Sequence, residues 1–191
     1  MKLRCDKIFD CDDRSDEENC DYFEVDAKTY NKKYPPISRK EGTSVKVHLD
    51  IKTLKNIKEL DMNFDAKVTL TLEWFDSRLY YKNLLDNERP NIVKEESKSQ
   101  VWIPSLVFNN TYEDIMVTNK VNSILLIHKQ GNHTTAPLAS INEDFYYKGS
   151  ENMLSLQIGY DLTFQCEFQL KNYPFDTQKC LIEVNSIFIN I

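Results

Sequence analysis

The feature that constrains this chain most is the segment from Cys166 to Cys180, which reads CEFQLKNYPFDTQKC. A disulfide between these cysteines would cross-link neighbouring strands and hold the tip rigid, and closing such a loop contributes roughly 3 kcal/mol to stability. Pro174 fixes its own φ and favours an extended Tyr173, so we expect the tip to be a defined turn. The Tyr173–Pro174 bond is also a candidate cis peptide. The cysteine spacing alone would indicate an ordinary structural disulfide.

The residues between the two cysteines resemble the signature loop of the Cys-loop (pentameric ligand-gated) ion channels. That pattern is a Cys, thirteen residues with an aromatic-Pro-x-Asp core, and a second Cys; Pro174, Asp176 and Gln178 all fit it. In that family the loop lies at the membrane-facing end of the extracellular domain and relays ligand binding to the pore. The resemblance therefore implies a gating loop formed by Tyr173, Pro174, Phe175 and Asp176.

Two further motifs precede this loop in the order that the family has. Residues 73–79 read EWFDSRL and resemble the family's Glu-Trp-x-Asp-x-Arg-Leu element at the end of its second strand. Residues 101–104 read VWIP and resemble its Trp-x-Pro-Asp element, with Ser105 in place of the Asp. A buried Trp and a capping Pro are common in any sandwich, so the order and spacing of the motifs carry the resemblance. It covers residues 45–191.

Apolar and polar residues alternate with a period of two in three segments, residues 45–51, 64–74 and 154–170. This pattern predicts strands with one buried and one wet face. The last run is longer than a typical strand, so we expect a bend, most simply at Gly159. Shorter strands are predicted at residues 101–108, 115–128 and 181–189, with charged loops at 86–100 and 130–148. The predicted fold is all-β, an immunoglobulin-like antiparallel β-sandwich that is incomplete at its C-terminus.

Composition restricts the class of protein. The chain has 191 residues, enough for one full domain with a sizeable core and a small module. Its net charge of −6 argues against a nucleic-acid surface, which needs a basic face. It contains no run of about eighteen apolar residues that would span a membrane. No Ser/His/Asp set, Gly-rich phosphate loop or catalytic carboxylate pair stands out, so an enzyme is not expected.

The cysteines indicate an oxidising compartment, because the five of them fall into two tight groups. The start of the chain, from Met1 to Cys5, lacks the apolar region of a secretory signal. An extracellular chain without a signal and with an odd cysteine is expected to be a fragment, with its natural start and end outside these residues.

Residues 1–20 hold three of the cysteines, interspersed with carboxylates, and too little apolar material for a core. Such a composition suits a small module held by disulfides and a metal. Oxygen ligands favour a hard cation, which outside cells is usually Ca²⁺. An EF-hand is excluded because residues 10–15 have no Gly at the sixth position of the loop. The alternative is a solvated acidic linker.

This segment closely resembles the C-terminal half of an LDL-receptor class A repeat. The resemblance implies a Ca²⁺ site with side-chain oxygens from Asp6, Asp10, Asp16 and Glu17 and backbone carbonyls from Leu3 and Ile8. It also implies a disulfide between Cys5 and Cys20, and it leaves Cys11 without the partner it has in the family. The predicted organisation is a partial repeat at 1–20, a polar linker at 21–44, and a truncated ligand-binding domain at 45–191.

The family's agonist site is an aromatic box between subunits. Its positions fall at Thr69, near Asn109, and at Ile187 beside Phe188, where cholinergic members have Trp, Tyr and Trp. A cation–π cage for a quaternary ammonium needs the faces of Trp or Tyr. Acetylcholine is therefore not the expected ligand of this subunit acting alone, and the ligand-binding residues stay unknown.

Two sequons, Asn109-Asn110-Thr111 and Asn132-His133-Thr134, predict glycosylation at Asn109 and Asn132, although such triplets also arise by chance. The three histidines are far apart and show no metal-ligand spacing.

The resemblance implies the extracellular ligand-binding domain of a neurotransmitter-gated channel subunit. Such a domain senses a small neurotransmitter-like ligand, assembles with four further subunits, and couples to a pore outside this segment at the plasma membrane. The main alternative is a secreted, channel-less binding protein of the same fold. A more distant alternative is an adhesion or scavenging module in which the Ca²⁺-binding repeat is the active part. Neither the ligand nor the ion selectivity follows from the sequence.

Overall fold

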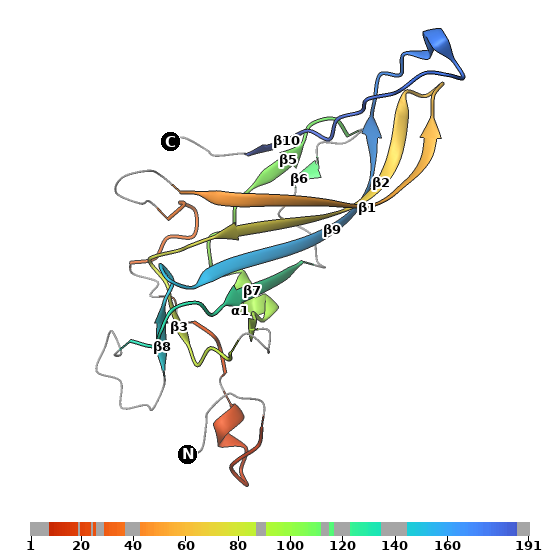
Figure 1. Cartoon of the computed structure of the whole chain (residues 1–191). Helices are drawn as coiled ribbons and strands as arrows, with labels where there is room; N and C mark the ends of the chain where they lie inside the picture. Colours follow the sequence, from red (N-terminus) through yellow and green to blue (C-terminus); the bar gives the residue numbers. More distant parts are fainter. Residues whose placement is uncertain are drawn as a thin grey trace. The chain divides into compact units, whose positions relative to one another are not determined.

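The computed structural model describes residues 8–18, 20–23, 25, 29–36, 43–86, 91–111, 115–116, 123–134 and 145–186 (Figure 1). The chain divides into two compact units. Unit 1 comprises residues 1–46, 73–102 and 124–156, and unit 2 comprises 47–72, 103–123 and 157–191. Each unit is described by itself below.

Most of the regular secondary structure of the described residues is in strands. The strands are β1 (Val45–Lys58), β2 (Asn63–Trp74), β3 (Tyr80–Lys82), β4 (Asn91–Ile92), β5 (Leu106–Phe108), β6 (Ile115–Met116), β7 (Ile124–His128), β8 (Tyr146–Lys148), β9 (Met153–Gln165) and β10 (Val184–Ser186). Short helical turns occur at η1 (Ser15–Glu17), α1 (Glu95–Lys98) and η3 (Leu170–Asn172). The predicted all-β class is confirmed.

Among the described residues the strands form three sheets, with the strand orders β1-β2-β9-β7-β4, β10-β5-β6 and β3-β8. Pairing is antiparallel between β10 and β5, β5 and β6, β3 and β8, and β4 and β7. In the three-stranded sheet Val184 lies opposite Phe108, and Phe108 lies opposite Ile115. The long strands β1, β2 and β9 each run through both units.

The alternation in β2 and β9 is confirmed. In β2 the side chains of Ala66, Val68, Leu70 and Leu72 are fully buried. In β9 every second side chain, from Leu154 to Phe164, is buried. Successive side chains of a strand point to opposite faces, so a two-residue period places one whole set in the core. The strand continues through Gly159 without interruption and ends at Gln165 rather than at residue 170.

In unit 2 the two larger sheets pack face to face through aromatic rings. Phe64 of β2 stacks on Phe164 of β9, with ring centroids 5.6 Å apart. Phe108 of β5, on the opposite sheet, forms edge-to-face pairs with Tyr160 and Phe164, with ring centroids 5.4 and 5.6 Å apart. Edge-to-face pairs at such distances are favourable beyond the area they bury. Unit 2 is therefore a β-sandwich with an aromatic centre, as the sequence predicts.

The prediction of a buried face for residues 45–51 is wrong for β1. Val47 and Ile51 are 46% and 49% exposed, and Leu54 and Ile57 further along the strand are each 56% exposed. The strand lies at the edge of its sheet. Among the described residues no strand of the opposite sheet covers this face, since β10 is only three residues long. Asn56 has a φ of 50°, which interrupts the regular alternation.

The segments predicted as single short strands or as loops contain shorter strands, and in places more of them, than the sequence predicts. Residues 101–105 are not in a strand, and only Leu106–Phe108 is. Residues 115–128 contain two strands, β6 and β7, and residues 181–189 contain β10. The charged stretch at 86–100, predicted as a loop, includes β4 and α1. The described parts of the stretch at 130–148 include β8.

Unit 1 is organised around a buried ion pair. Asp76 is fully buried, and its carboxylate accepts hydrogen bonds from Arg78 Nη2 at 2.7 Å and Nε at 2.8 Å. The hydroxyl of Tyr30 donates to Asp76 Oδ2 at 2.9 Å and accepts the Trp102 N–H at 2.8 Å. Burial raises the pKa of Tyr30 above its usual range, so this hydroxyl stays a donor. The Trp102 ring meets Trp74 edge to face at 6.0 Å.

The two motifs noted in the sequence, at 73–79 and 101–104, are thus joined through Tyr30. This residue comes from the stretch 21–44, which the sequence predicts as a linker. Phe23 from the same stretch is 3% exposed and forms an antiparallel bridge with Tyr81. The stretch therefore contributes side chains to the core of unit 1. The predicted boundaries of the linker stay a prediction.

We expect Tyr30→Phe to lower the free energy of unfolding by about 1–3 kcal/mol, because it leaves one buried acceptor and one buried donor without this partner. Urea denaturation followed by tryptophan fluorescence measures the change. Tyr34→Phe is the matched control, since Tyr34 is 48% exposed. Equal stability of the two variants would show that the Tyr30 hydroxyl contributes nothing.

Candidate functional site

The loop from Cys166 to Cys180 is closed by a disulfide, with the two Cα atoms 5.3 Å apart. At its first cysteine the loop is fixed to the turn between β1 and β2. The Cys166 N–H donates to the Met62 carbonyl at 2.9 Å. The Phe168 N–H lies 3.3 Å from the Met62 sulfur. The loop and the β1–β2 turn therefore form one end of unit 2 (Figure 1).

Gln178 bridges the two sides of the loop. Its Oε1 accepts the Gln169 N–H at 2.9 Å and its Nε2 donates to the Gln169 carbonyl at 3.1 Å. The same Nε2 donates to the carboxylate of Asp176. The side-chain amide thus takes the place of a backbone partner in a strand pair, and Asp176 is held against the loop. This gives Gln178 and Asp176 a positioning role.

The tip itself consists of two tight turns. The Tyr173 N–H donates to the Leu170 carbonyl at 3.1 Å, and the Phe175 N–H donates to the Asn172 carbonyl at 2.8 Å. The bond between Tyr173 and Pro174 is cis, which is the isomer that the sequence raises as a candidate. The backbone of the tip is therefore defined by its own hydrogen bonds.

Sequence reasoning missed one residue that organises the base of the loop. Asn110 Nδ2 donates to the carbonyls of Leu181 at 2.7 Å and Gln165 at 3.2 Å, and its Oδ1 accepts the Glu183 N–H at 3.0 Å. One side chain thus holds the chain entering the loop to the chain leaving it. In the sequence Asn110 is only the middle residue of a sequon. Its contacts with Gln165, Leu181 and Glu183 join residues far apart along the chain, so no local sequence pattern predicts them.

The tip exposes apolar side chains. Phe175 is 93% exposed and Tyr173 is 69% exposed. Leu60 in the β1–β2 turn is 94% exposed, and Leu181 after the second cysteine is 69% exposed. Aromatic and aliphatic side chains held out on a rigid loop are typical of a surface that contacts a partner.

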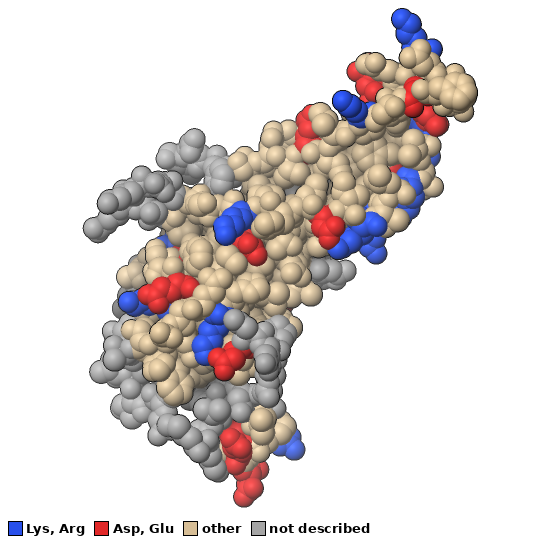
Figure 2. All heavy atoms as spheres, in the orientation of Figure 1, with Lys and Arg blue, Asp and Glu red and all other residues tan. Residues whose placement is uncertain are grey.

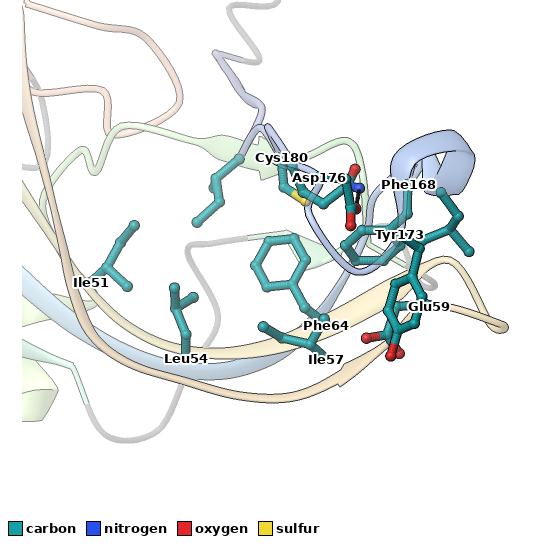
Figure 3. A pocket seen from close by; sticks show the side chains of 12 residues that line it. Ile51, Leu54, Ile57, Glu59, Phe64, Phe168, Tyr173, Asp176 and Cys180 are labelled. Atoms are coloured by element: carbon teal, nitrogen blue, oxygen red, sulfur yellow. Dashed lines mark hydrogen bonds between the residues drawn. The ribbon is translucent and has the colours of Figure 1, made fainter.

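A groove of about 440 Å³ lies behind the loop, entirely within unit 2 (Figure 3). Ile51, Leu54 and Ile57 of β1 form one wall. The other lining residues are Glu59, Phe64, Phe168, Leu170, Tyr173, Asp176, Gln178, Cys180 and Ile182. The lining is mainly apolar, and its carboxylates are those of Glu59 and Asp176.

The predicted agonist-box positions are only partly described. Thr69 is half-buried in β2, and Asn109 is exposed directly after β5. Ile187 and Phe188 lie outside the described residues. At the two described positions the structure has no aromatic side chain, so the ligand-binding residues of this chain are not identified.

The acidic N-terminal segment folds around Asp16. This carboxylate is 7% exposed and accepts the N–H groups of Asp10 at 2.7 Å and Cys11 at 3.3 Å. The hydrogen bond from Asp10 is the main cause that lowers the pKa of Asp16. Glu17 is half-buried and Ile8 is 49% exposed. Acidic side chains gather at this end of the chain in Figure 2.

The remaining predicted Ca²⁺ ligands, Leu3 and Asp6, lie outside the described residues, as does Cys5. Within the part of the chain that the structure describes, no group of three or more His, Cys, Asp or Glu side chains is placed to hold a metal ion. Cys20 is disulfide-bonded, and its partner lies outside the described residues. Cys11 is partly buried. The metal site and the Cys5–Cys20 pairing stay predictions.

Both predicted glycosylation sites, Asn109 and Asn132, are exposed. In the sequon at 109–111 the Thr111 hydroxyl donates to the Phe108 carbonyl at 3.3 Å. No helix among the described residues is both long enough and apolar enough to cross a membrane.

Comparison with known proteins agrees with this architecture. The family model described as "Neurotransmitter-gated ion-channel ligand binding domain" matches residues 22–144. The match begins inside the predicted linker and does not extend over residues 1–20, so the resemblance of that segment to an LDL-receptor class A repeat stays a prediction.

Similar curated proteins are channel and receptor subunits. The pH-sensitive chloride channel 2 of Drosophila melanogaster is 28% identical over 84% of this chain and 28% of its own length. An acetylcholine-gated chloride channel subunit of Caenorhabditis elegans is 24% identical over 85% of this chain and 30% of its own. The human neuronal acetylcholine receptor subunit beta-4 is 28% identical over 80% of this chain and 26% of its own. The chain thus spans less than a third of the length of these relatives. Because the family match covers well over half of the 191 residues, the chain belongs to the neurotransmitter-gated ion-channel ligand-binding domain family.

Proposed function

We propose that this chain is the extracellular ligand-sensing part of a neurotransmitter-gated channel subunit. The subunit assembles with four others at the plasma membrane and couples to an ion pore supplied by the longer protein. The observation that carries the proposal is the rigid Cys166–Cys180 loop, which holds Phe175 93% exposed in a domain of this family. Relatives named as chloride channels and as an acetylcholine receptor subunit support it. The family consists of channel subunits, which are not enzymes.

In this proposal each loop residue has a separate task. Phe175 and Tyr173 provide the apolar surface that contacts the pore-domain linkers. Asp176 fixes the turn through Gln178, and the disulfide keeps the two sides of the loop together. When ligand binding moves the sandwich, the closed loop moves with it as one body. The movement therefore reaches the pore domain instead of being lost in internal motion of a flexible loop.

The proposal is tested by expressing the longer protein in oocytes and recording currents during application of a panel of neurotransmitters and pH steps. We expect a ligand-evoked current. Ligand binding without any current, from protein recovered in the medium, would instead support a secreted binding protein of the same fold.

We expect acetylcholine to evoke no submillimolar current from this subunit expressed alone. Thr69 and Asn109 provide no aromatic face at two of the positions where a quaternary ammonium would be held. Oocyte recording measures this, with surface biotinylation as the control that receptors reach the membrane. Robust submillimolar acetylcholine currents would contradict it.

We further propose that residues 1–20 form part of a Ca²⁺-binding repeat, with oxygen ligands from Asp6, Asp10, Asp16 and Glu17. The donor set fits a hard cation. The lowered pKa of Asp16 keeps that carboxylate ionised at neutral pH, and the N–H groups of Asp10 and Cys11 already orient it. We also propose N-linked glycans at Asn109 and Asn132, both of which are exposed.

We expect Glu17→Gln to weaken Ca²⁺ binding by roughly tenfold or more, because a charged ligand becomes neutral. Calorimetry measures it on a protein that includes the upstream half of the repeat. Glu17→Gln is preferred to Asp16→Ala, since Asp16 also accepts two backbone N–H groups and its loss would unfold the turn. Asp12→Asn, at an exposed position outside the ligand set, is the control. Binding that is absent, or unchanged in Glu17→Gln, would contradict the site.

A further inference from the structure

Met62 joins the β1–β2 turn to the Cys166–Cys180 loop through two different acceptor atoms. Its backbone carbonyl accepts the Cys166 N–H at 2.9 Å. Its thioether sulfur accepts the Phe168 N–H, with the nitrogen and the sulfur 3.3 Å apart. A thioether is a weak acceptor, so the second contact is the weaker of the two. The attachment of the loop to the turn therefore depends in part on the chemical state of one sulfur atom.

The backbone conformation at Met62 is one that a different residue would adopt more easily. Its φ is 52°, in the left-handed region where Gly and Asn are common and a long side chain is rare. The residue closes the turn, with its N–H donating to the Glu59 carbonyl at 3.4 Å. Gly or Asn would make this turn with less strain, but neither would bring a sulfur to Phe168. The methionine side chain is therefore the feature that distinguishes this position.

Met62 is also accessible to small reagents. It is 40% exposed, more than Met153 of β9, which is half-buried. An open hollow of about 300 Å³ within unit 2 is lined by Met62 together with Asp61, Gln165, Cys166 and Glu167. Two of these lining residues are carboxylates, whose negative charge disfavours anionic reagents and leaves neutral ones unaffected. A small uncharged oxidant can therefore reach Met62 from the hollow.

We propose that Met62 is a site of reversible oxidation by peroxides, and that its oxidation releases Phe168 from the β1–β2 turn. A lone pair of the sulfur attacks one oxygen of hydrogen peroxide. The S–O bond forms as the O–O bond breaks, and the departing hydroxide takes the remaining proton to leave as water. The sulfur is oxidised by two electrons and the peroxide is reduced by two. Methionine sulfoxide reductases restore the thioether, so the modification is reversible.

The sulfoxide does not hold the Phe168 N–H as the thioether does. Oxidation makes the sulfur the positive end of a polar S–O bond and moves the acceptor to the oxygen, beyond the sulfur. Phe168 is 6% exposed, so its packed ring keeps the N–H from following the oxygen. The hydrogen bond from Cys166 to the Met62 carbonyl does not involve the sulfur and is retained. The loop thus loses one of these two attachments to the turn, and any effect of this loss on gating rests on the proposed function.

Peptide mapping and hydrogen exchange in the longer protein test the proposal. After mild treatment with hydrogen peroxide, mass spectrometry measures the sulfoxide formed at Met62 and at Met153. Fragmentation that resolves single amides measures hydrogen exchange at Phe168. The amide of Gln169 is the internal reference, because its acceptor is a side chain of the loop itself. Met62→Leu is the matched variant, since leucine has a similar volume and no sulfur.

We expect sulfoxide to form at least about tenfold faster at Met62 than at Met153, because Met62 is the more exposed. Exchange at the Phe168 amide should rise at least about fivefold relative to Gln169, and return after treatment with both sulfoxide reductases. In Met62→Leu, peroxide should change neither amide. Similar oxidation rates at the two methionines would overturn the site. Oxidation of Met62 with unchanged exchange at Phe168 would overturn the release of the loop. Since neither readout requires a current, a protein that fails the proposed function still decides this one.

Discussion

Replacing Arg78 with methionine is expected to lower the free energy of unfolding by about 3–5 kcal/mol, because it leaves a buried carboxylate without its cation. Asp76 is fully buried, and Arg78 approaches it with two nitrogen atoms at 2.7 and 2.8 Å. The other arm of the guanidinium donates to the carbonyls of Asn31 and Tyr34 at 3.2 and 3.0 Å. The substitution thus breaks the ion pair and releases the segment that contains Tyr30.

Equilibrium denaturation in urea measures this loss. The matched control is Lys55→Met, since Lys55 pairs with Asp161 at 2.9 Å but both side chains are about half exposed, at 45% and 57%. That exposed pair is expected to contribute no more than about 1 kcal/mol. If Arg78→Met and Lys55→Met lower the free energy of unfolding by the same small amount, the Asp76 carboxylate does not depend on Arg78 for its stability in the folded protein.

The strand end that carries Asp76 is constrained from another side as well. A Cβ on Gly149 would lie 2.1 Å from the Asp76 carbonyl and 2.9 Å from that of Leu79. The Gly149 N–H donates to the Leu79 carbonyl at 2.9 Å. Only a residue without a side chain permits this approach. The motif read in the sequence as EWFDSRL is therefore a packing and hydrogen-bonding unit that fixes the end of β2.

The sequence predicts the burial of a strand's apolar face correctly where the element that packs on that face lies within the described residues. In β9 every second residue is buried, and Phe108 of the opposite sheet packs on Tyr160 and Phe164 of that face. The apolar set of β2 is buried as well, so local alternation and final burial agree in both strands. β1 has the same alternation in its first half, yet its apolar side chains are exposed. Alternation states which side chains share a face, but whether that face is buried depends on a second element that local sequence does not specify.

The candidate site shows the same division. The disulfide, the cis-proline turn and the exposed aromatics follow from a contiguous motif of fifteen residues. The contributions of Met62 and Asn110 do not, because they arise from contacts between residues far apart along the chain. In the stretch at 21–44, the side chains of Phe23 and Tyr30 are buried in unit 1, a contribution that the polar composition of the stretch does not reveal.

Under the proposed function, Phe175→Ala is expected to reduce the agonist-evoked current while surface expression and ligand affinity remain near normal. The side chain is 93% exposed, so its removal takes little from the fold. The disulfide and the Gln178 hydrogen bonds that hold the tip remain in place. If the ring transmits a coupling free energy of about 1–3 kcal/mol, the gating equilibrium changes by roughly 5- to 150-fold.

Recording of maximal currents, with radioligand binding and surface labelling on the same cells, separates coupling from binding and folding. Phe75→Ala is the matched control, because Phe75 is also exposed, at 41%, and lies in unit 1 outside the loop. Cys166→Ser is a poorer test, since opening the disulfide loosens the tip and impairs folding together. A collapse of ligand affinity with intact gating of the bound receptor would assign the loop to ligand binding. A current unchanged from wild type would show that the exposed Phe175 ring has no partner in the channel. The apolar contact on which the coupling proposal depends would then have to come from Tyr173 or Leu60, which are also exposed at this end of unit 2.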